Sequence, residues 1–397
     1  MFLDDLKNEL QDFNNNDFFL GLTLKEKNYN KNYSPAESSN IFNVETSLEK
    51  YKKSILILKE LGIANFRFSL SWEAILPEGI GFVDQTKIAF YHEVLDYCIS
   101  NEIEPFVTLF DFNLPLPIEK KGGWLNREIV DWFENYVLIC INAFKTKVNY
   151  WIVINQSSVF TKSNFFTNKQ TLNEKWLNDF LPFLHHTLLC QSVGYKTIKK
   201  ISQDTQVGSV FPCHFIKPKS FSDKDLKAAE RIDAIVNRVF LEPSLGFGYP
   251  IKMAPCLKKI SKYFLKGDDE LLKVDFDFIG LQNFKPEIVE HDLYIPFINA
   301  RVINQNKNES DLGSSEFENN SDLFYRIIRK YTNYEEIKKI IFFENNSSLL
   351  EEMILLHDNQ SIKPIQIITF MQQIIKAKNN GGKVDGYFIS LNSHTLD

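Results

Sequence analysis

Eight short apolar runs recur along the chain, and their spacing constrains the fold more than any other feature. Each run has the near-continuous hydrophobic character of strands that are buried on both faces. The runs lie at 18–23, 65–71, 105–110, 150–155, 207–212, 277–282, 340–344 and 386–391. Successive runs start 40 to 70 residues apart. These intervals leave room for the crossover helix that parallel strands require.

Helical periodicity fills several of the intervals. Apolar residues recur every three to four positions at 48–61, 85–99, 127–144, 225–241 and 363–377. Gly62 ends the first of these patterns and Asp84 is a candidate N-cap for the second. Alternating strands and helices predict a (β/α)₈ TIM barrel. A doubly wound α/β sheet is the competing fold, but no glycine-rich nucleotide motif follows the first run.

The composition describes a folded chain and excludes several classes of partner. Of its 397 residues, 44% are hydrophobic and 24% are charged, which is too apolar for a disordered protein. The alternation of predicted strands and helices continues across the polar segments 28–40 and 304–322. We therefore expect one domain over 1–397, with these segments as barrel loops. A net charge of −6 argues against nucleic acid as a partner. No run of 18 apolar residues is present, so we expect no membrane association.

Cysteine usage and the N-terminus indicate a reducing compartment. The five cysteines contain no CxxC pair, so neither a disulfide framework nor a zinc site is expected. The first residues are acidic and amphipathic rather than basic and apolar, as a secretory signal would be. We therefore predict a cytoplasmic protein.

Polar residues follow the apolar runs, where a barrel of this kind carries its active site. No histidine stands at these positions, and no carboxylates have the spacing of metal ligands, so we expect no metal and no cofactor. His185 and His186 lie in the middle of a helical pattern, which favours a packing or surface role over a ligand role. The residues that stand out at or near the ends of the runs are Arg67, Asp111, Phe112, Asn155, Gln156, Asn283 and Glu344.

Several segments resemble glycoside hydrolase family 1, the β-glucosidase family. They are YKKSILILKELGIANFRFSLSWEAILPEGIG (51–81), EPFVTLFDFNLP with KGGWLNREIVDWFENY (104–136), VNYWIVINQ (148–156), AAERIDAIVNRVFLEP (228–243), DFIGLQNF (277–284), IIFFENN (340–346) and GYFISL (386–391). They occur in the family's order and cover most of the chain. The resemblance implies the same (β/α)₈ barrel that the periodicity predicts.

The resemblance also implies a catalytic site. Family members hydrolyse β-glycosides with retention, using two carboxylates about 5–5.5 Å apart. Glu344 matches the nucleophile, whereas the acid/base position holds Gln156. Arg67 and Asn155 match residues of the family's site, and we expect Arg67 to keep Glu344 ionised.

Other sugar-binding positions are changed. By the same resemblance, Asn28 stands in place of the family's sugar-binding Gln, and Asp111 with Phe112 stands in place of His-Trp. Asn283 replaces the Tyr that bonds the nucleophile. Asp111 is also a candidate substitute acid. We count these four positions, together with Arg67 and Asn155, which match the family, as the candidate substrate contacts.

The function that we predict depends on Gln156, the residue at the acid/base position. A carboxamide has no proton to give at physiological pH, and general acid–base help is worth about 10²–10⁴-fold. We therefore predict a family 1-like barrel in which ordinary hydrolysis is impaired or lost, a pseudoenzyme with a residual sugar-binding or structural role. The alternative is an active, thioglucosidase-like retaining β-glycosidase that uses Glu344 on substrates with good leaving groups.

The end of the sequence generates one further expectation. The family places a final helix after the eighth strand, whereas this sequence stops at Asp397, six residues after Leu391. We expect a barrel without that helix, whose exposed eighth strand is covered by residues 1–13, a second copy, another protein or a continuation of the chain beyond Asp397.

Overall fold

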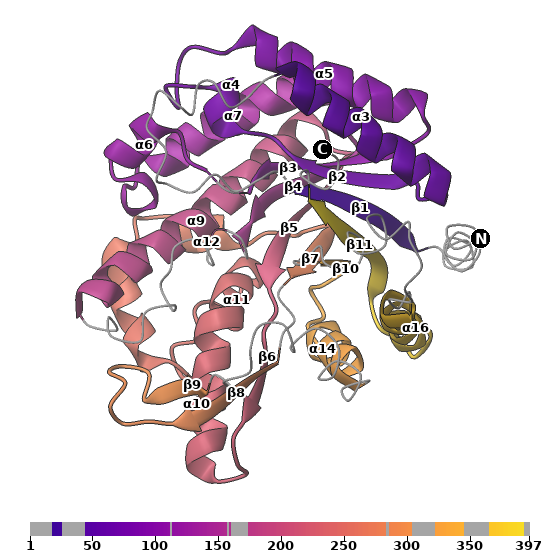
Figure 1. Ribbon diagram of the computed structural model, residues 1–397. Coiled ribbons are helices and arrows are strands. Elements are labelled where there is room, and N and C mark those ends of the chain that lie inside the picture. Colours follow the sequence, from indigo (N-terminus) through magenta and orange to yellow (C-terminus); the bar gives the residue numbers. More distant parts are fainter. Residues whose placement is uncertain are drawn as a thin grey trace.

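The chain folds into a closed barrel of eight parallel strands (Figure 1). The computed structural model describes residues 18–25, 44–111, 113–156, 159, 174–282, 286–303, 322–344 and 365–392. The barrel strands are β1 (Phe19–Lys25), β2 (Asn65–Ser69), β3 (Glu104–Phe110), β4 (Tyr150–Asn155), β5 (Gln206–Pro212), β7 (Phe278–Gln282), β10 (Ile340–Phe343) and β11 (Val384–Asn392). Each coincides with a predicted run, so the predicted (β/α)₈ barrel is confirmed.

Strand order around the barrel follows the chain, with β1 closing on β11. The order is β1-β11-β10-β7-β5-β4-β3-β2, and every neighbouring pair is parallel. The carboxyl ends of all eight strands therefore lie at one end of the barrel. The candidate residues at these strand ends belong to a single region of the molecule.

Helices surround the barrel, and each predicted helical stretch contains one. The longer helices are α3 (Val44–Leu61), α5 (Gln85–Ser100), α7 (Ile129–Phe144), α9 (Glu174–Ile201), α10 (Asp223–Asp233), α14 (Asp322–Thr332) and α16 (Ile365–Asn379). Shorter helices are α4 (Trp72–Ile75), α6 (Leu116–Lys120), α11 (Val239–Leu245) and α12 (Asp268–Leu272), with 3₁₀ turns η1 (Gly123–Leu125) and η3 (Pro255–Tyr263). The predicted N-cap of α5 is confirmed, since the Asp84 carboxylate accepts the Thr86 N–H at 2.9 Å.

The stretch predicted as one helix over 225–241 is a composite. A π-helical turn, η2 (Ala234–Arg238), joins α10 to α11. Within this turn, the Asn237 side chain accepts the His214 N–H and donates to the His214 carbonyl, both at 2.8 Å. Such widened turns are uncommon and often occur at functional sites. Here the turn holds the chain that leaves β5.

A small second sheet was not predicted. It has the order β6-β8-β9, from β6 (Phe215–Pro218), β8 (Pro286–His291) and β9 (Ala300–Ile303). Its strands are short and mostly half-buried, and they carry charged residues, so they lack an apolar run. β6 and β8 follow the carboxyl ends of β5 and β7, and α10 packs on the sheet. The polar segments predicted as loops, 28–40 and 304–322, lie outside the described residues except for Asp322, which begins α14.

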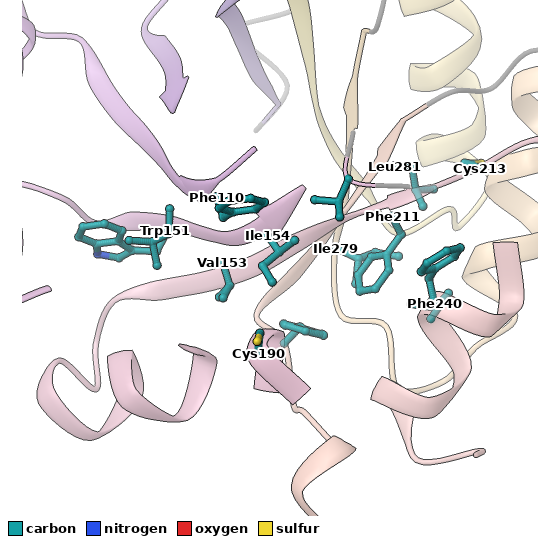
Figure 2. Close-up of a cluster of buried hydrophobic side chains, with 14 of the residues drawn as sticks. Phe110, Trp151, Val153, Ile154, Cys190, Phe211, Cys213, Phe240, Ile279 and Leu281 are labelled. Carbon is teal, nitrogen blue, oxygen red and sulfur yellow. The ribbon is translucent and has the colours of Figure 1, made fainter. Parts of the chain in front are cut away.

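Two hydrophobic layers stabilise the barrel. The interior is filled by a separate cluster of Phe106, Ile152, Val210, Phe278, Ile341, Phe343 and Phe388, with Phe19 and Tyr150 against it. Phe106 and Phe388 come from strands that are not neighbours, yet their ring centroids are 4.8 Å apart. Such contacts form only across a barrel interior. Figure 2 shows part of the second layer, where side chains of β3, β4, β5 and β7 meet Cys190 of α9 and Phe240 of α11.

Helix α9 packs closely against the barrel because it contains a glycine at the contact. A Cβ on Gly194 would lie 2.4 Å from Cγ1 of Val153 on β4 and 3.2 Å from the Phe133 ring on α7. Val153 is fully buried and, being β-branched, has little rotamer freedom. The absence of a side chain at Gly194 therefore sets how near α9 comes to β4.

We predict that Gly194→Ala destabilises the protein, although alanine is the better helix former by about 1 kcal/mol. Overpacking of this kind costs about 1–3 kcal/mol, and urea denaturation measures the net loss. In a Val153→Ala background the clashing methyl is absent, so the same substitution should cost less. Equal costs in both backgrounds would contradict a steric origin.

Candidate active site

The described candidate residues lie at or near the carboxyl ends of four strands. Arg67 is on β2, Asp111 follows β3, Asn155 and Gln156 end β4, and Glu344 follows β10. All five are buried. The other candidates, Asn28, Phe112 and Asn283, lie outside the described residues.

Asp111 joins three neighbouring strands. One of its carboxylate oxygens, Oδ2, accepts the Ser69 hydroxyl at 2.9 Å and Nη2 of Arg67 at 3.4 Å. The other, Oδ1, accepts Nδ2 of Asn155 at 3.0 Å. Both oxygens are thus engaged by side chains of β2 and β4, and this corner of the barrel mouth is bonded internally.

Arg67 is the most deeply buried charge at the site, with a relative exposure of 1%. Its Nε donates to the Thr108 hydroxyl at 3.0 Å, and the guanidinium lies 4.7 Å from the centroid of the Phe343 ring. Burial lowers the pKa of the guanidinium, and the Asp111 carboxylate opposes that shift. A positive charge taken this far from water needs a close counter-charge.

That counter-charge is not the one the sequence analysis expected. In the described part of the chain, the ion pair of Arg67 is with Asp111 rather than Glu344. The strand order explains the difference, because β3 neighbours β2, whereas β1 and β11 separate β2 from β10. An acidic residue at the end of β3 is therefore the nearer partner.

Glu344 is held by the two strands beside β10. Its carboxylate oxygen Oε2 accepts the Ser390 N–H of β11 at 2.9 Å, and its own N–H donates to the Phe388 carbonyl at 2.9 Å. On the other side, Nε2 of Gln282 at the end of β7 donates to the Glu344 carbonyl at 3.4 Å. The residue is 8% exposed, so its carboxylate has a fixed place at the barrel mouth.

Gln156 is fastened to helices outside the barrel. Its amide nitrogen donates to the Thr187 carbonyl and to Oε1 of Gln191, both on α9 and both at 3.3 Å. Gln191 in turn donates to the Ser244 hydroxyl of α11 at 2.9 Å. Gln156 is 0% exposed. This chain of amides gives Gln156 a structural role that links β4 to α9 and α11.

The sequence analysis missed three of the polar groups that complete the mouth, Thr23, Thr108 and Ser390. Thr23 on β1 pairs in register with Ser390 on β11 and with Arg67 on β2. The hydroxyls of Thr23 and Ser390, with Oε1 of Gln282, are buried and lack a hydrogen-bond partner within the described residues, whereas the Thr108 hydroxyl accepts Nε of Arg67. Buried polar atoms rarely stay unpaired. Polar residues at alternate positions of the apolar runs were the available signal.

His185 and His186 have the packing role that the sequence favoured. His185 is fully buried on α9, with Nδ1 3.0 Å from the Tyr249 hydroxyl and Nε2 2.9 Å from the Asp268 carboxylate. Nδ1 of His186 donates to the Trp124 carbonyl at 2.9 Å. Burial lowers the pKa of both side chains, that of His186 to about 4. Their neutral forms therefore tie α9 to the segments before α7 and around α12.

Features of other classes of function are absent from the part of the chain that the structure describes. Among the described residues, no three His, Cys, Asp or Glu side chains are grouped to hold a metal ion. In the same residues, no helix combines the length and the apolar character needed to cross a bilayer. The five cysteines are free thiols, four of them buried.

Comparison with known sequences adds a family assignment to this geometry. The family model described as Glycosyl hydrolase family 1 matches residues 28–393. The 6-phospho-beta-glucosidase GmuD of Bacillus subtilis is 31% identical over 265 residues, which are 66% of this chain and 56% of that protein. A 1,4-beta-D-glucan glucohydrolase of Thermotoga neapolitana is 27% identical and aligns with 86% of this chain and 80% of its own length. The chain thus spans little more than half of GmuD.

Solved structures share the fold. A family 1 β-glucosidase from Thermotoga maritima has a TM-score of 0.71 at 24% identity, covering 86% of this chain and 76% of that one. An enzyme called AHE from Alicyclobacillus herbarius has a TM-score of 0.77 at 20% identity, covering 94% and 87%. The Thermotoga maritima enzyme is also known in complexes with deoxynojirimycin and castanospermine.

We predict that the buried histidines make stability depend on pH between about 6.5 and about 4. In this window His186 is protonated in the unfolded chain but neutral in the folded protein. Its contribution to the free energy of unfolding is therefore fully present above pH 6.5 and is lost as the pH drops. The slope contributed by His186 is at most about 1.4 kcal/mol per pH unit.

Urea denaturation at several pH values measures this slope. His186→Asn keeps a donor for the Trp124 carbonyl but does not titrate, so its stability should vary less across the window. The same slope in both proteins would refute a role for His186.

Proposed function

Because the chain belongs to glycosyl hydrolase family 1, we propose that it is a β-glucosidase-like member whose ordinary hydrolysis is impaired or lost. In this proposal the barrel mouth retains a sugar-binding role. The observation that carries it is Gln156 at the acid/base position, with its amide bonded to α9.

The surroundings of Gln156 favour an amide over an acid. The Thr187 carbonyl can only accept a hydrogen bond, and it takes one from the Gln156 amide nitrogen. A carboxylate in the same place would meet that carbonyl without a proton between them. Gln191 can turn its amide to adapt, because the Ser244 hydroxyl both donates and accepts, but the Thr187 carbonyl has no such freedom. These contacts therefore favour an amide at position 156 over an ionised carboxylate of the same shape.

Retained sugar binding is supported by the unpaired polar atoms. Thr23, Gln282 and Ser390 carry hydroxyl or amide oxygens with no partner among residues that the structure describes. Gln282 and Ser390 are on the two strands beside β10, which Glu344 follows, and Thr23 pairs in register with Ser390. A polyhydroxylated ligand supplies such partners. The likeness to a β-glucosidase that binds deoxynojirimycin and castanospermine makes a carbohydrate the ligand class we propose.

Glu344 supports a second candidate function, slow hydrolysis of β-glycosides with good leaving groups. Its carboxylate is fixed at the end of β10 by the Ser390 N–H. Attack of that carboxylate on the anomeric carbon would break the bond to an aryl oxygen or sulfur, which leaves with the electron pair. An added nucleophile, or water that gives its proton to a base in solution, would then displace the Glu344 carboxylate from the anomeric carbon and release the sugar. Neither step takes a proton from residue 156.

We expect no turnover of alkyl β-glucosides and, at most, slow turnover of dinitrophenyl β-glucoside. Loss of general acid help reduces the rate of the first class by about 10²–10⁴-fold. A 2-fluoro-substituted dinitrophenyl glycoside and mass spectrometry would test for a covalent adduct on Glu344, with Glu344→Gln as the matched control.

The outcomes separate the candidate functions. An adduct on Glu344 favours the slow glycosidase, and its absence together with deoxynojirimycin binding favours a binding protein. Hydrolysis of alkyl glucosides at the roughly 10 s⁻¹ typical of enzymes would refute the proposal.

We predict that Gln156→Glu destabilises the fold instead of restoring hydrolysis. A buried acceptor left without its donor costs about 1–3 kcal/mol, measured by urea denaturation. Gln156→Leu is the control, since it removes the same donor without adding charge. A glutamate variant less stable than the leucine variant indicates repulsion at the Thr187 carbonyl. Recovered alkyl glucosidase activity would show that the rest of the site is intact.

A further inference from the structure

The donors around Asp111 form a set that suits one kind of ligand. A guanidinium, a hydroxyl and an amide N–H converge on its two oxygens from Arg67, Ser69 and Asn155. Each of these groups is directed at the carboxylate as a donor, and one is charged. Convergent donors of this type bind carboxylates.

Arg67 and Asn155 are buried together with Asp111, and Ser69 is half-buried beside them, so these donors depend on the anion that they bind. Arg67 is 1% exposed, Asn155 is 1% exposed and Asp111 is 5% exposed. Removing one member of a buried ion pair leaves the other charge without compensation, which costs far more than removing both. The three donor side chains therefore need an anion between them to keep this arrangement.

We propose that Arg67, Ser69 and Asn155 form a carboxylate-binding cradle at the barrel mouth and that Asp111 is its permanent internal occupant. Asp111 acts as a blocking residue, because it bonds Arg67 and Asn155 and withholds them from any ligand. This inference deepens the proposed function and rests on it for the identity of the mouth. It also names the ligand class that the emptied cradle would take, a small monocarboxylate.

The barrel mouth has two halves, which differ in how their polar side chains are hydrogen-bonded. On β2, β3 and β4 the side chains of Arg67 and Asn155 are paired through Asp111, whereas Oε1 of Gln156 has no partner among the described residues. On β1, β7 and β11 the described residues leave the hydroxyls of Thr23 and Ser390 and Oε1 of Gln282 unpaired. A sugar at the mouth would therefore contact the second half and leave the first half unchanged.

Replacement of the occupant by free acetate tests the cradle. Asp111→Gly removes the carboxylate and leaves space for one. We expect this variant to have a lower melting temperature, and we expect sodium acetate, but not sodium chloride at equal ionic strength, to raise it in a saturable manner. The wild-type melting temperature should respond equally to both salts, because its cradle is filled. A glycine variant that responds equally to both salts overturns the proposal.

A second variant keeps the test decisive if the glycine variant does not fold. Asp111→Asn preserves shape and one acceptor oxygen but leaves Arg67 without a counter-charge. We expect its melting temperature to fall further than that of the control Asn155→Ala, which removes a neutral donor. It should recover in the double variant that adds Arg67→Met. An unchanged melting temperature in Asp111→Asn overturns the proposal.

These measurements do not depend on turnover. If acetate restores the glycine variant while the wild type hydrolyses alkyl glucosides, the cradle stands and the proposed function falls. If acetate has no specific effect and no glycoside is hydrolysed, the cradle falls and the proposed function stands.

Discussion

Pairing of the first strand with the last is the constraint on which the whole molecule depends. β1 and β11 pair over seven residues, from Phe19 with Gly386 to Lys25 with Asn392. This contact joins segments more than 350 residues apart in the sequence and turns an open sheet into a barrel. It also sets Thr23 beside Ser390, the residue whose N–H bonds Glu344 after the neighbouring β10. Without closure the strand ends would form an edge and could not form a mouth.

Chain periodicity was sufficient to predict the barrel, because strands buried on both faces must be apolar along their whole length. It was not sufficient for β6, β8 and β9, which are short and carry Lys217, Glu287 and Arg301 among their residues. The sequence also could not predict the π turn at Asn237, because such a turn preserves the helical spacing of apolar residues on either side of it.

The site was predicted in position and only partly in its contacts. Asn155 and Gln156 are adjacent in sequence, and the sequence alone suggests that both serve the same pocket. In the structure the pairing of β4 with β5 shifts register between Ile152 and Asn155. Asn155 then bonds Asp111, whereas Gln156 bonds α9. A register shift of this kind has no signature in the local sequence, and neither does the choice of Asp111 over Glu344 as the partner of Arg67.

The aromatic rings inside the barrel determine by which route a ligand can enter and leave. Phe343 lies under Arg67, and the Phe343 ring centroid is 5.0 Å from that of Phe388. Phe388 packs in turn on Phe106, which stacks on Tyr150. These rings therefore fill the barrel interior below the mouth and close it to passage. A molecule that enters has to leave by the way it came, so arrival of one ligand and departure of another compete for the same passage.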